Sequence, residues 1–200
     1  MNTRKHILKS ALLLFLEKGF KNVSYQDLVK KTKLSKGAIY HYFVSKDMLL
    51  VSVFELFSQR SDQGVGVSFD NLFKDVDAFK TFYIGLRKQQ LKDFKAFVGA
   101  EIAKFNWVLF CLEAVEANED LRETIKAMSN RDIKFFESCF VSLKNNGALP
   151  KERDPIVLAK NLYYLIEGEG LIMFLQGNEL DDDYIDRLDK TLDDFFNMIN

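Results

Sequence analysis

The chain has 200 residues, of which 48% are hydrophobic and 28% charged, and it contains only ten Gly and two Pro. This composition is typical of a folded domain and excludes disordered, collagen-like and low-complexity sequence. No uncharged run approaches the roughly 18–20 residues of a transmembrane helix, and the first residues lack the pattern of a secretory signal. Cys111 and Cys139 need not form a disulfide framework, so we expect a reducing, cytoplasmic location and no contact with a membrane.

The net charge of −1 conceals an asymmetry along the chain. Residues 1–50 hold ten Lys and Arg against three acidic residues, a net charge of +7, whereas residues 51–200 have a net charge of −8. A basic head on an acidic body indicates that the head meets a polyanion. A lysine-rich face in contact with solvent explains the same charge equally well.

Helical patterns cover nearly the whole sequence, and no strand-like alternation persists. We therefore predict an all-α fold of about nine helices, over about residues 3–18, 24–32, 35–42, 45 onward, 75–94, 100–116, 118–146, 154–177 and 181–199. Residues 61–70 include Gly64 and Gly66 and lack a helical pattern, which predicts a loop or hinge. We expect a head over residues 1–61 and a larger helical body over residues 62–200.

The three short helices of the head predict a helix-turn-helix, with its motif over about residues 24–43. Only Thr32-Lys33-Leu34 separates the second helix from the third. Apolar residues at suitable spacing would close a small core, namely Phe15, Phe20, Leu28, Val29, Leu34, Ile39 and Phe43. The third helix would then enter the major groove of DNA with its exposed side chains. We expect Lys36, Gly37, Tyr40 and His41 on that face, with Ser24 and Lys46 contacting phosphates.

One stretch of this head carries a family resemblance. Residues 34–43 read Leu-Ser-Lys-Gly-Ala-Ile-Tyr-His-Tyr-Phe and are soon followed by Ser45-Lys46-Asp47. With this stretch, residues 7–50 resemble the DNA-binding head of the tetracycline-repressor (TetR) family of bacterial transcription regulators. The resemblance implies DNA contacts from Ser24, Lys33, Ser35, Lys36, Gly37, Ala38, Tyr40, His41 and Lys46.

Two residues depart from the family pattern. Val29 stands where the family usually has Ala, and Lys33 stands in the turn where it usually has Gly. If the position of Lys33 requires a positive φ, the lysine costs about 1 kcal/mol of strain.

The resemblance also implies that the body binds a ligand and forms a homodimer. The last two helices carry broad apolar stripes, and two helices from each subunit would build a four-helix interface. The predicted interface residues are Leu158, Leu162, Leu165, Ile166, Ile172, Tyr184, Leu188, Leu192 and Phe195. Gly168 and Gly170 lie within the first of these helices and indicate a close backbone approach. Packing within one subunit is the alternative explanation of both stripes.

Aromatic residues are abundant in the middle helices. Each of them is more often part of a core, but together they fit an apolar or flat ligand. The candidate ligand contacts are Phe79, Phe82, Tyr83, Phe105, Trp107, Phe110, Phe136, Phe140 and Glu167. Asn106, Glu113, Glu167 and Glu169 interrupt apolar helices, where they would orient a ligand, including a cationic one, or face solvent.

We find no catalytic, metal-binding or cofactor motif. Both histidines, His6 and His41, lie in the head, and neither cysteine belongs to a Cys-x-x-Cys pair. The sequence therefore predicts a homodimeric repressor that binds double-stranded DNA and leaves a near-palindromic operator when a small apolar or aromatic effector binds. The alternative is a helical carrier of a hydrophobic small molecule with a non-functional head. The sequence leaves the effector, the operator and the choice between repression and activation open.

Overall fold

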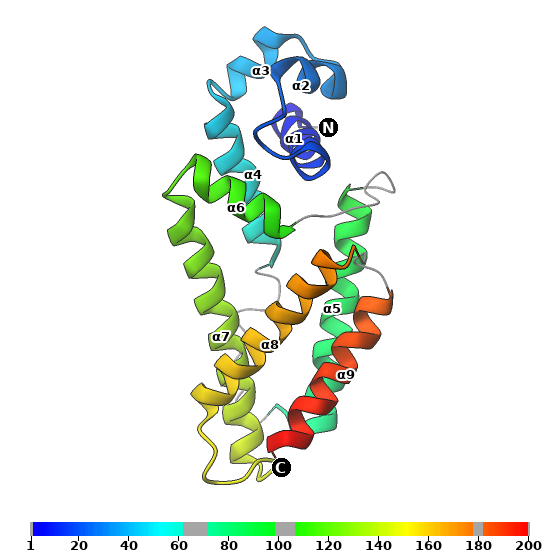
Figure 1. Cartoon of the computed structure of the whole chain (residues 1–200), viewed down its shortest axis with the longest axis vertical. Helices are drawn as coiled ribbons and strands as arrows, with labels where there is room; N and C mark the ends of the chain where they lie inside the picture. The colour runs from blue at the N-terminus through cyan, green and yellow to red at the C-terminus, as the bar shows by residue number, and fades with distance from the viewer. Residues whose placement is uncertain (1, 62–71, 99–106, 178–181, 200) are drawn as a thin grey trace. The chain divides into compact units, whose positions relative to one another are not determined.

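The computed structural model describes residues 2–61, 72–98, 107–177 and 182–199, and its regular secondary structure in these ranges is entirely helical. The helices are α1 (Thr3–Lys18), α2 (Tyr25–Thr32), α3 (Lys36–Tyr42), α4 (Lys46–Ser61), α5 (Val76–Val98), α6 (Trp107–Ala117), α7 (Leu121–Asn145), α8 (Pro155–Leu175) and α9 (Asp182–Ile199) (Figure 1). The predicted all-α class is confirmed. The predicted hinge over residues 61–70 lies outside the described residues except for Ser61. The predicted ligand residues Phe105 and Asn106 also lie outside them, as does the side chain of Trp107.

Short-range capping signals set the helix boundaries of the head. The hydroxyl of Ser24 accepts a hydrogen bond from the backbone N–H of Asp27 at 3.2 Å, and the Asp27 carboxylate accepts one from the Ser24 N–H at 2.9 Å. This reciprocal pair is a capping box at the start of α2. Ser35 caps α3 in a similar way by accepting from the Ala38 N–H at 3.1 Å.

The chain divides into two compact units, and the first comprises residues 1–63 and 94–126. Phe15 of α1, Leu28 of α2 and Phe43 at the end of α3 are buried in this unit, as the sequence predicts. The other predicted core residues are Phe20 and Ile39, which are also buried, and Val29 and Leu34, which are half-buried.

Helix α6 belongs to the first unit. The ring of Phe110 in α6 stacks on that of Phe15 with centroids 6.3 Å apart and on that of Phe54 in α4 at 5.7 Å. This packing is the reason why the unit differs from the predicted boundary at residue 61. The assignment of separate functions to residues 1–61 and 62–200 stays a prediction.

The second unit comprises residues 64–93 and 127–200, and its core is formed by α5, α7, α8 and α9. Aromatic rings fill much of this core, including Phe79, Tyr83, Phe136, Phe140 and Phe196. Phe79 lies 5.7 Å from Phe196 and 6.0 Å from Phe140 between ring centroids. Edge and tilted contacts of this kind add to the free energy gained from burial.

The predicted dimer interface needs a correction, because most of its residues lie inside this core. Seven of the nine are buried, namely Leu158, Leu162, Ile166, Tyr184, Leu188, Leu192 and Phe195. Leu165 and Ile172 are exposed, with 39% and 48% of their surface accessible. The stripe of α9 therefore packs within its own subunit, which is the alternative that the sequence left open. No helix among the described residues combines the length and apolar character needed to cross a bilayer.

Candidate nucleic-acid interface

The turn between α2 and α3 is fixed by hydrogen bonds on both sides. The Lys33 N–H donates to the Val29 carbonyl at 2.9 Å and closes the end of α2. The hydroxyl of Thr32 donates to the Leu28 carbonyl at 2.7 Å and accepts from the Leu34 N–H at 3.2 Å. Lys33 has φ 60° and ψ 20°, so this position does adopt the left-handed conformation for which the sequence left a strain cost open. The two helices and this turn form a helix-turn-helix.

Helix α3 has one buried and one exposed side. Ile39 is fully buried on the inner side. We call the exposed set on the turn and the outer side the recognition surface, and it consists of Lys33, Lys36, Gly37, Tyr40 and His41. Ser35 and Ala38, two further predicted DNA contacts, form the cap of α3. The Ser35 hydroxyl accepts a hydrogen bond from the backbone N–H of Ala38, which is half-buried.

A stack of two tyrosines supports the recognition surface, and the sequence reasoning missed one of them. The ring of Tyr25, the first residue of α2, lies 4.5 Å from that of Tyr40 at an angle of 13°. The ammonium of Lys36 lies 5.5 Å from the Tyr40 ring centroid and 6.0 Å from that of Tyr25. Burial, followed by the influence of Tyr40, raises the pKa of Tyr25 to about 12, so its phenol stays protonated. The stack fixes the directions of Tyr40 and Lys36.

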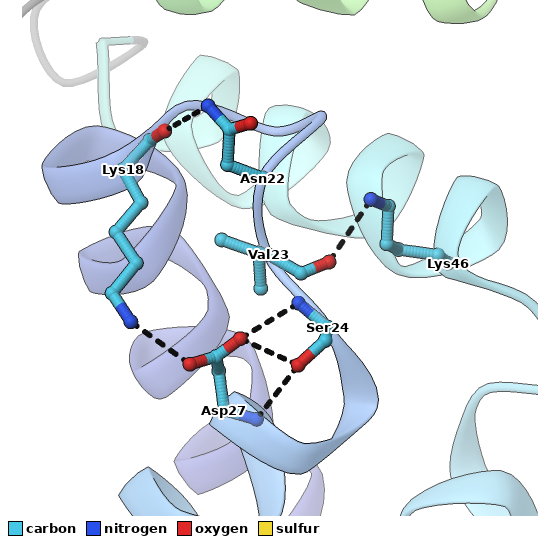
Figure 2. Close-up of polar contacts among 6 residues, drawn as sticks. All are labelled: Lys18, Asn22, Val23, Ser24, Asp27 and Lys46. Atoms are coloured by element: carbon cyan, nitrogen blue, oxygen red, sulfur yellow. Dashed lines mark hydrogen bonds and ion pairs between the residues drawn. The ribbon is translucent and has the colours of Figure 1, made fainter.

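Ser24 is engaged within the head (Figure 2). Its hydroxyl donates to the Asp27 carboxylate at 2.6 Å, and that carboxylate also pairs with Lys18 at 2.8 Å. Hydrogen bonds from Lys18 and Ser24 hold the pKa of Asp27 well below its usual range. Because the Ser24 hydroxyl proton is used by Asp27, the residue serves as a helix cap, and its predicted phosphate contact would require that bond to break.

Lys46 also differs from the prediction. Its ammonium donates to the carbonyls of Phe20 at 2.8 Å, Val23 at 3.0 Å and Lys21 at 3.4 Å (Figure 2 draws the bond to Val23). The same group lies 4.3 Å from the ring centroid of Phe20, and burial lowers its pKa. An ammonium has three protons, so Lys46 holds the α1–α2 turn instead of presenting a free charge to a phosphate.

Glu113 of α6 contacts the α1–α2 turn within the first unit. Its carboxylate accepts a hydrogen bond from the Phe20 N–H at 2.5 Å. One turn further along α6, Glu116 pairs with Lys21 at 2.7 Å. These long-range contacts carry no local sequence signal, which is why the sequence did not reveal them.

The predicted ligand contacts separate into two groups. Phe79, Tyr83, Phe136 and Phe140 are buried together in the second unit, and Phe82 is half-buried against that core. Phe110 is buried in the first unit, where its partners are Phe15 and Phe54. Glu167 has an exposed surface on α8, and burial of its carboxyl group raises its pKa.

Comparison with known proteins connects this geometry to a family. A family model described as "Bacterial regulatory proteins, tetR family" matches residues 7–53. The uncharacterized HTH-type transcriptional regulator YuxN of Bacillus subtilis is 42% identical over 57 residues, which cover 28% of this chain and 20% of YuxN. The regulator YerO of the same organism is 25% identical over 171 residues, 82% of this chain and 55% of YerO. The repressor NemR of Escherichia coli is 37% identical over 54 residues, 27% of each protein.

The matched parts thus span between a fifth and about half of these relatives' own length. Among solved structures, E. coli NemR in its reduced form has a TM-score of 0.69 at 20% identity and covers 100% of this chain and 99% of its own. The fatty acid degradation regulator FadR of Bacillus halodurans has a TM-score of 0.65 at 16% identity, with 100% and 95% covered. At these identities the structures show a shared fold.

The helix-turn-helix, the family model and these relatives agree on one class of protein. Residues 7–53 match the tetR family of bacterial regulatory proteins, and the chain shares the fold of the solved structures above.

Proposed function

We propose that the chain is a transcriptional regulator that binds double-stranded DNA as a homodimeric repressor and leaves a near-palindromic operator when a small, largely apolar effector binds. The observation that carries the proposal is the exposed side of α3, where Lys36, Gly37, Tyr40 and His41 share one accessible face. A helix of this kind enters the major groove with its N-terminal residues toward the base edges.

Each residue of the recognition surface has a role in this proposal. Lys36 donates to guanine O6 and N7, and Lys33 and His41 contact phosphates or the groove wall. A Cβ built on Gly37 meets nothing within 4 Å, so the helix surface has no bulk at this position. The DNA backbone or a base edge can therefore approach the α3 backbone closely there. Tyr40, steadied by Tyr25, contacts a phosphate or a thymine methyl group.

The dimer is proposed on an exposed apolar face of α8, which we call the α8 stripe. It comprises Val157, Tyr164, Leu165, Leu171, Ile172 and Leu175, with 38–67% of each residue accessible. The residues recur at spacings of three, four and seven, with exposed Gly168 between them, so they share one side of the helix. A second copy of this chain is the proposed occupant, since an isologous interface pairs the same stripe from both subunits. The absence of a side chain at Gly168 permits the two helices to approach closely.

The test is a selection for DNA from a random duplex library with the purified protein, followed by fluorescence anisotropy on the enriched duplex at several salt concentrations. We expect one near-palindromic sequence and an affinity that falls steeply with salt. Lys36→Ala should weaken specific binding by about 1–3 kcal/mol, whereas Lys88→Ala, which removes an exposed charge from α5, should not. Failure to enrich any sequence would instead favour the helical carrier with a non-functional head.

A further inference from the structure

A polar cluster interrupts the aromatic core of the second unit. We call it the Arg87 cluster, and its members come from all four helices of the core: Tyr83 and Arg87 from α5, Asp132 from α7, Tyr163 and Glu167 from α8, and Tyr184 from α9. Tyr83 and Arg87 lie one turn apart on α5, Tyr163 and Glu167 lie one turn apart on α8, and Arg87 donates a hydrogen bond to Tyr184 of α9. Electrostatic interactions connect Arg87 with Glu167 and Tyr163 with Asp132. Arg87, Asp132 and Tyr163 are half-buried and Glu167 is exposed, so the cluster reaches the surface of the unit.

The guanidinium of Arg87 is held in place by neutral partners. It donates to the Tyr184 hydroxyl at 2.7 Å and to the Gln90 amide oxygen at 3.2 Å, and it lies 5.9 Å from the ring centroid of Tyr184. Among the residues that the structure describes, no carboxylate forms an ion pair with Arg87. A guanidinium has five N–H donors in a planar fork, so this one retains donors for a further acceptor.

The charge of Arg87 is only partly balanced from within the unit. Asp132 pairs with Arg131, whose Nε lies 3.9 Å from its carboxylate. Burial raises the pKa of Glu167, Arg87 opposes this shift, and Asp132 adds to it. A partly desolvated cation without a paired anion is costly, and an anionic ligand would remove that cost.

Buried aromatic rings lie beside the Arg87 fork. The ring of Tyr83 is buried, with its centroid 5.2 Å from that of Phe136 and 6.0 Å from that of Phe79. Tyr163 closes another side, where its hydroxyl donates to Ser129 at 2.8 Å. A planar cation next to stacked rings suits a flat molecule that carries an anionic group at one end.

We propose that the Arg87 cluster binds the carboxylate of a small molecule with a flat apolar body. The carboxylate accepts from the fork of Arg87, whose planar geometry matches two oxygens in a way that an ammonium does not. For the apolar body to contact Tyr83 and Phe136, these two rings, which are buried in the unliganded structure, must move apart. This inference rests on the proposed function, because it names the chemical class of the effector. It also replaces the cationic ligand that Glu167 alone would favour, since Arg87 repels a cation.

The experiment is isothermal titration calorimetry of the full chain with three probes of matched shape: 2-naphthoate, the neutral 2-naphthamide and the cationic 2-naphthylmethylammonium. We expect naphthoate to bind about tenfold or more tightly than the amide, because a hydrogen bond to a charged group is stronger than one between neutral groups. The cation should bind most weakly. Equal binding of the amide, tighter binding of the cation, or no binding of naphthoate would each overturn the proposal.

Variants connect the preference to Arg87. Arg87→Met should abolish the preference for naphthoate, whereas Lys88→Met, which removes a neighbouring exposed charge from α5, should retain it. If Arg87→Met fails to fold, as judged by circular dichroism, Arg87→Lys keeps the charge but loses the fork and should lose most of the preference. A preference that survives both Arg87 variants would overturn the assignment.

DNA binding by the same preparations separates this inference from the proposed function. Anisotropy with the selected duplex, in the absence of any probe, should give equal affinities for the unmodified chain and Arg87→Met. If naphthoate binds through Arg87 but no duplex is selected, the carboxylate site stands and the regulator proposal fails. If a duplex is bound but naphthoate is not, the carboxylate site alone fails.

Discussion

The carboxylate of Glu113 accepts a hydrogen bond from the backbone N–H of Phe20, a residue 93 positions earlier in the chain. On the other side of the same residue, the ammonium of Lys46 donates to the Phe20 carbonyl at 2.8 Å. An acid on the N–H and a cation on the carbonyl therefore hold the two peptide units on either side of Phe20 in the α1–α2 turn. This turn leads directly into the Ser24 cap of α2, so α4 and α6 both help to position the helix-turn-helix.

Gly19, which directly precedes Phe20, should not tolerate a side chain. Its φ of 79° and ψ of 151° lie in a region that is essentially restricted to glycine. A Cβ there would also come within 2.8 Å of the Glu113 carboxylate. We expect Gly19→Ala to lower the free energy of unfolding by about 1–3 kcal/mol, measured by urea denaturation.

Two further variants assign the cause of that loss. Because the end of the Glu113 side chain can move and the backbone cannot, adding Glu113→Ala to Gly19→Ala should recover little stability. Gly85→Ala is the matched control, since a Cβ at this position in α5 meets nothing within 4 Å and the change should stabilise the helix by up to about 1 kcal/mol. A neutral Gly19→Ala variant would contradict the backbone argument.

Lys33 should lower the stability of the head through backbone strain while supplying a positive charge for DNA binding. A non-glycine residue in the left-handed region costs about 1 kcal/mol or more, so Lys33→Gly should raise the free energy of unfolding by about that amount. Lys33→Ala should not, because alanine keeps the strain. Both variants lose one positive charge, and both should reduce the salt slope of DNA binding by about 0.9 if Lys33 contacts a phosphate. Chemical denaturation and anisotropy titrations in varied salt measure the two effects, and an unchanged slope would remove Lys33 from the interface.

Local signals account for what the sequence predicted well. The Ser24 and Ser35 caps each depend on residues within three positions of the chain. Such interactions can be found by inspection of a few consecutive residues. The predicted helix ranges therefore agree closely with the structure wherever its residues are described.

Tertiary partners account for what the sequence did not predict. The roles of Lys46 and Glu113 depend on carbonyl and N–H groups that lie far away in the chain. The stripe of α9 is apolar because one face is buried, but an apolar pattern does not identify what covers that face. In the structure, residues such as Leu188 and Leu192 are covered by the core of their own unit. The stack of Tyr25 on Tyr40 joins two helices, and neither residue signals it alone.

Gly37→Ala should separate DNA binding from folding. A Cβ at position 37 meets nothing in the protein, and alanine favours a helix, so the free energy of unfolding should stay unchanged or rise by up to about 1 kcal/mol. In the groove, the added methyl group would occupy the space that DNA requires, so affinity for the selected duplex should fall. Urea denaturation and anisotropy of the same preparation test both parts. Unchanged affinity would mean that DNA does not approach this part of α3.

Leu171→Glu should break the proposed dimer. Leu171 lies in the α8 stripe with 38% of its surface accessible, and burying a charge there against a second copy is costly. Sedimentation equilibrium should show a monomer, and DNA affinity should fall because only one head binds at a time. Met198→Glu is the control, since Met198 is 67% accessible on α9 and lies outside the stripe. A dimeric Leu171→Glu variant would place the interface elsewhere.

Asp27 should make the head less stable in acid. Its pKa is lowered in the folded state by Lys18 and Ser24, so its contribution to stability is present above the unfolded pKa of about 3.9 and is lost as the pH falls below that value. The same pair raises the pKa of Lys18, chiefly through the hydrogen bond with Asp27. That contribution is present at neutral pH and is lost only as the pH rises above the ordinary range of lysine.

Asp27→Asn removes both contributions. The free energy of unfolding of this variant should therefore fall less steeply as the pH is lowered. The gap between the urea unfolding midpoints of the variant and the unmodified chain should be widest near pH 7 and should narrow toward pH 3, because Asp27 of the unfolded chain becomes protonated below about pH 3.9 while Asp27 of the folded head is still ionised. Glu55→Gln, which removes an exposed carboxylate from α4, should leave the gap between neutral and acid midpoints largely intact. Parallel curves for Asp27→Asn and the unmodified chain across this range would mean that the Lys18–Asp27–Ser24 contacts do not stabilise the folded head, and that the start of α2 depends on the Ser24 hydroxyl and the packing of Leu28 alone.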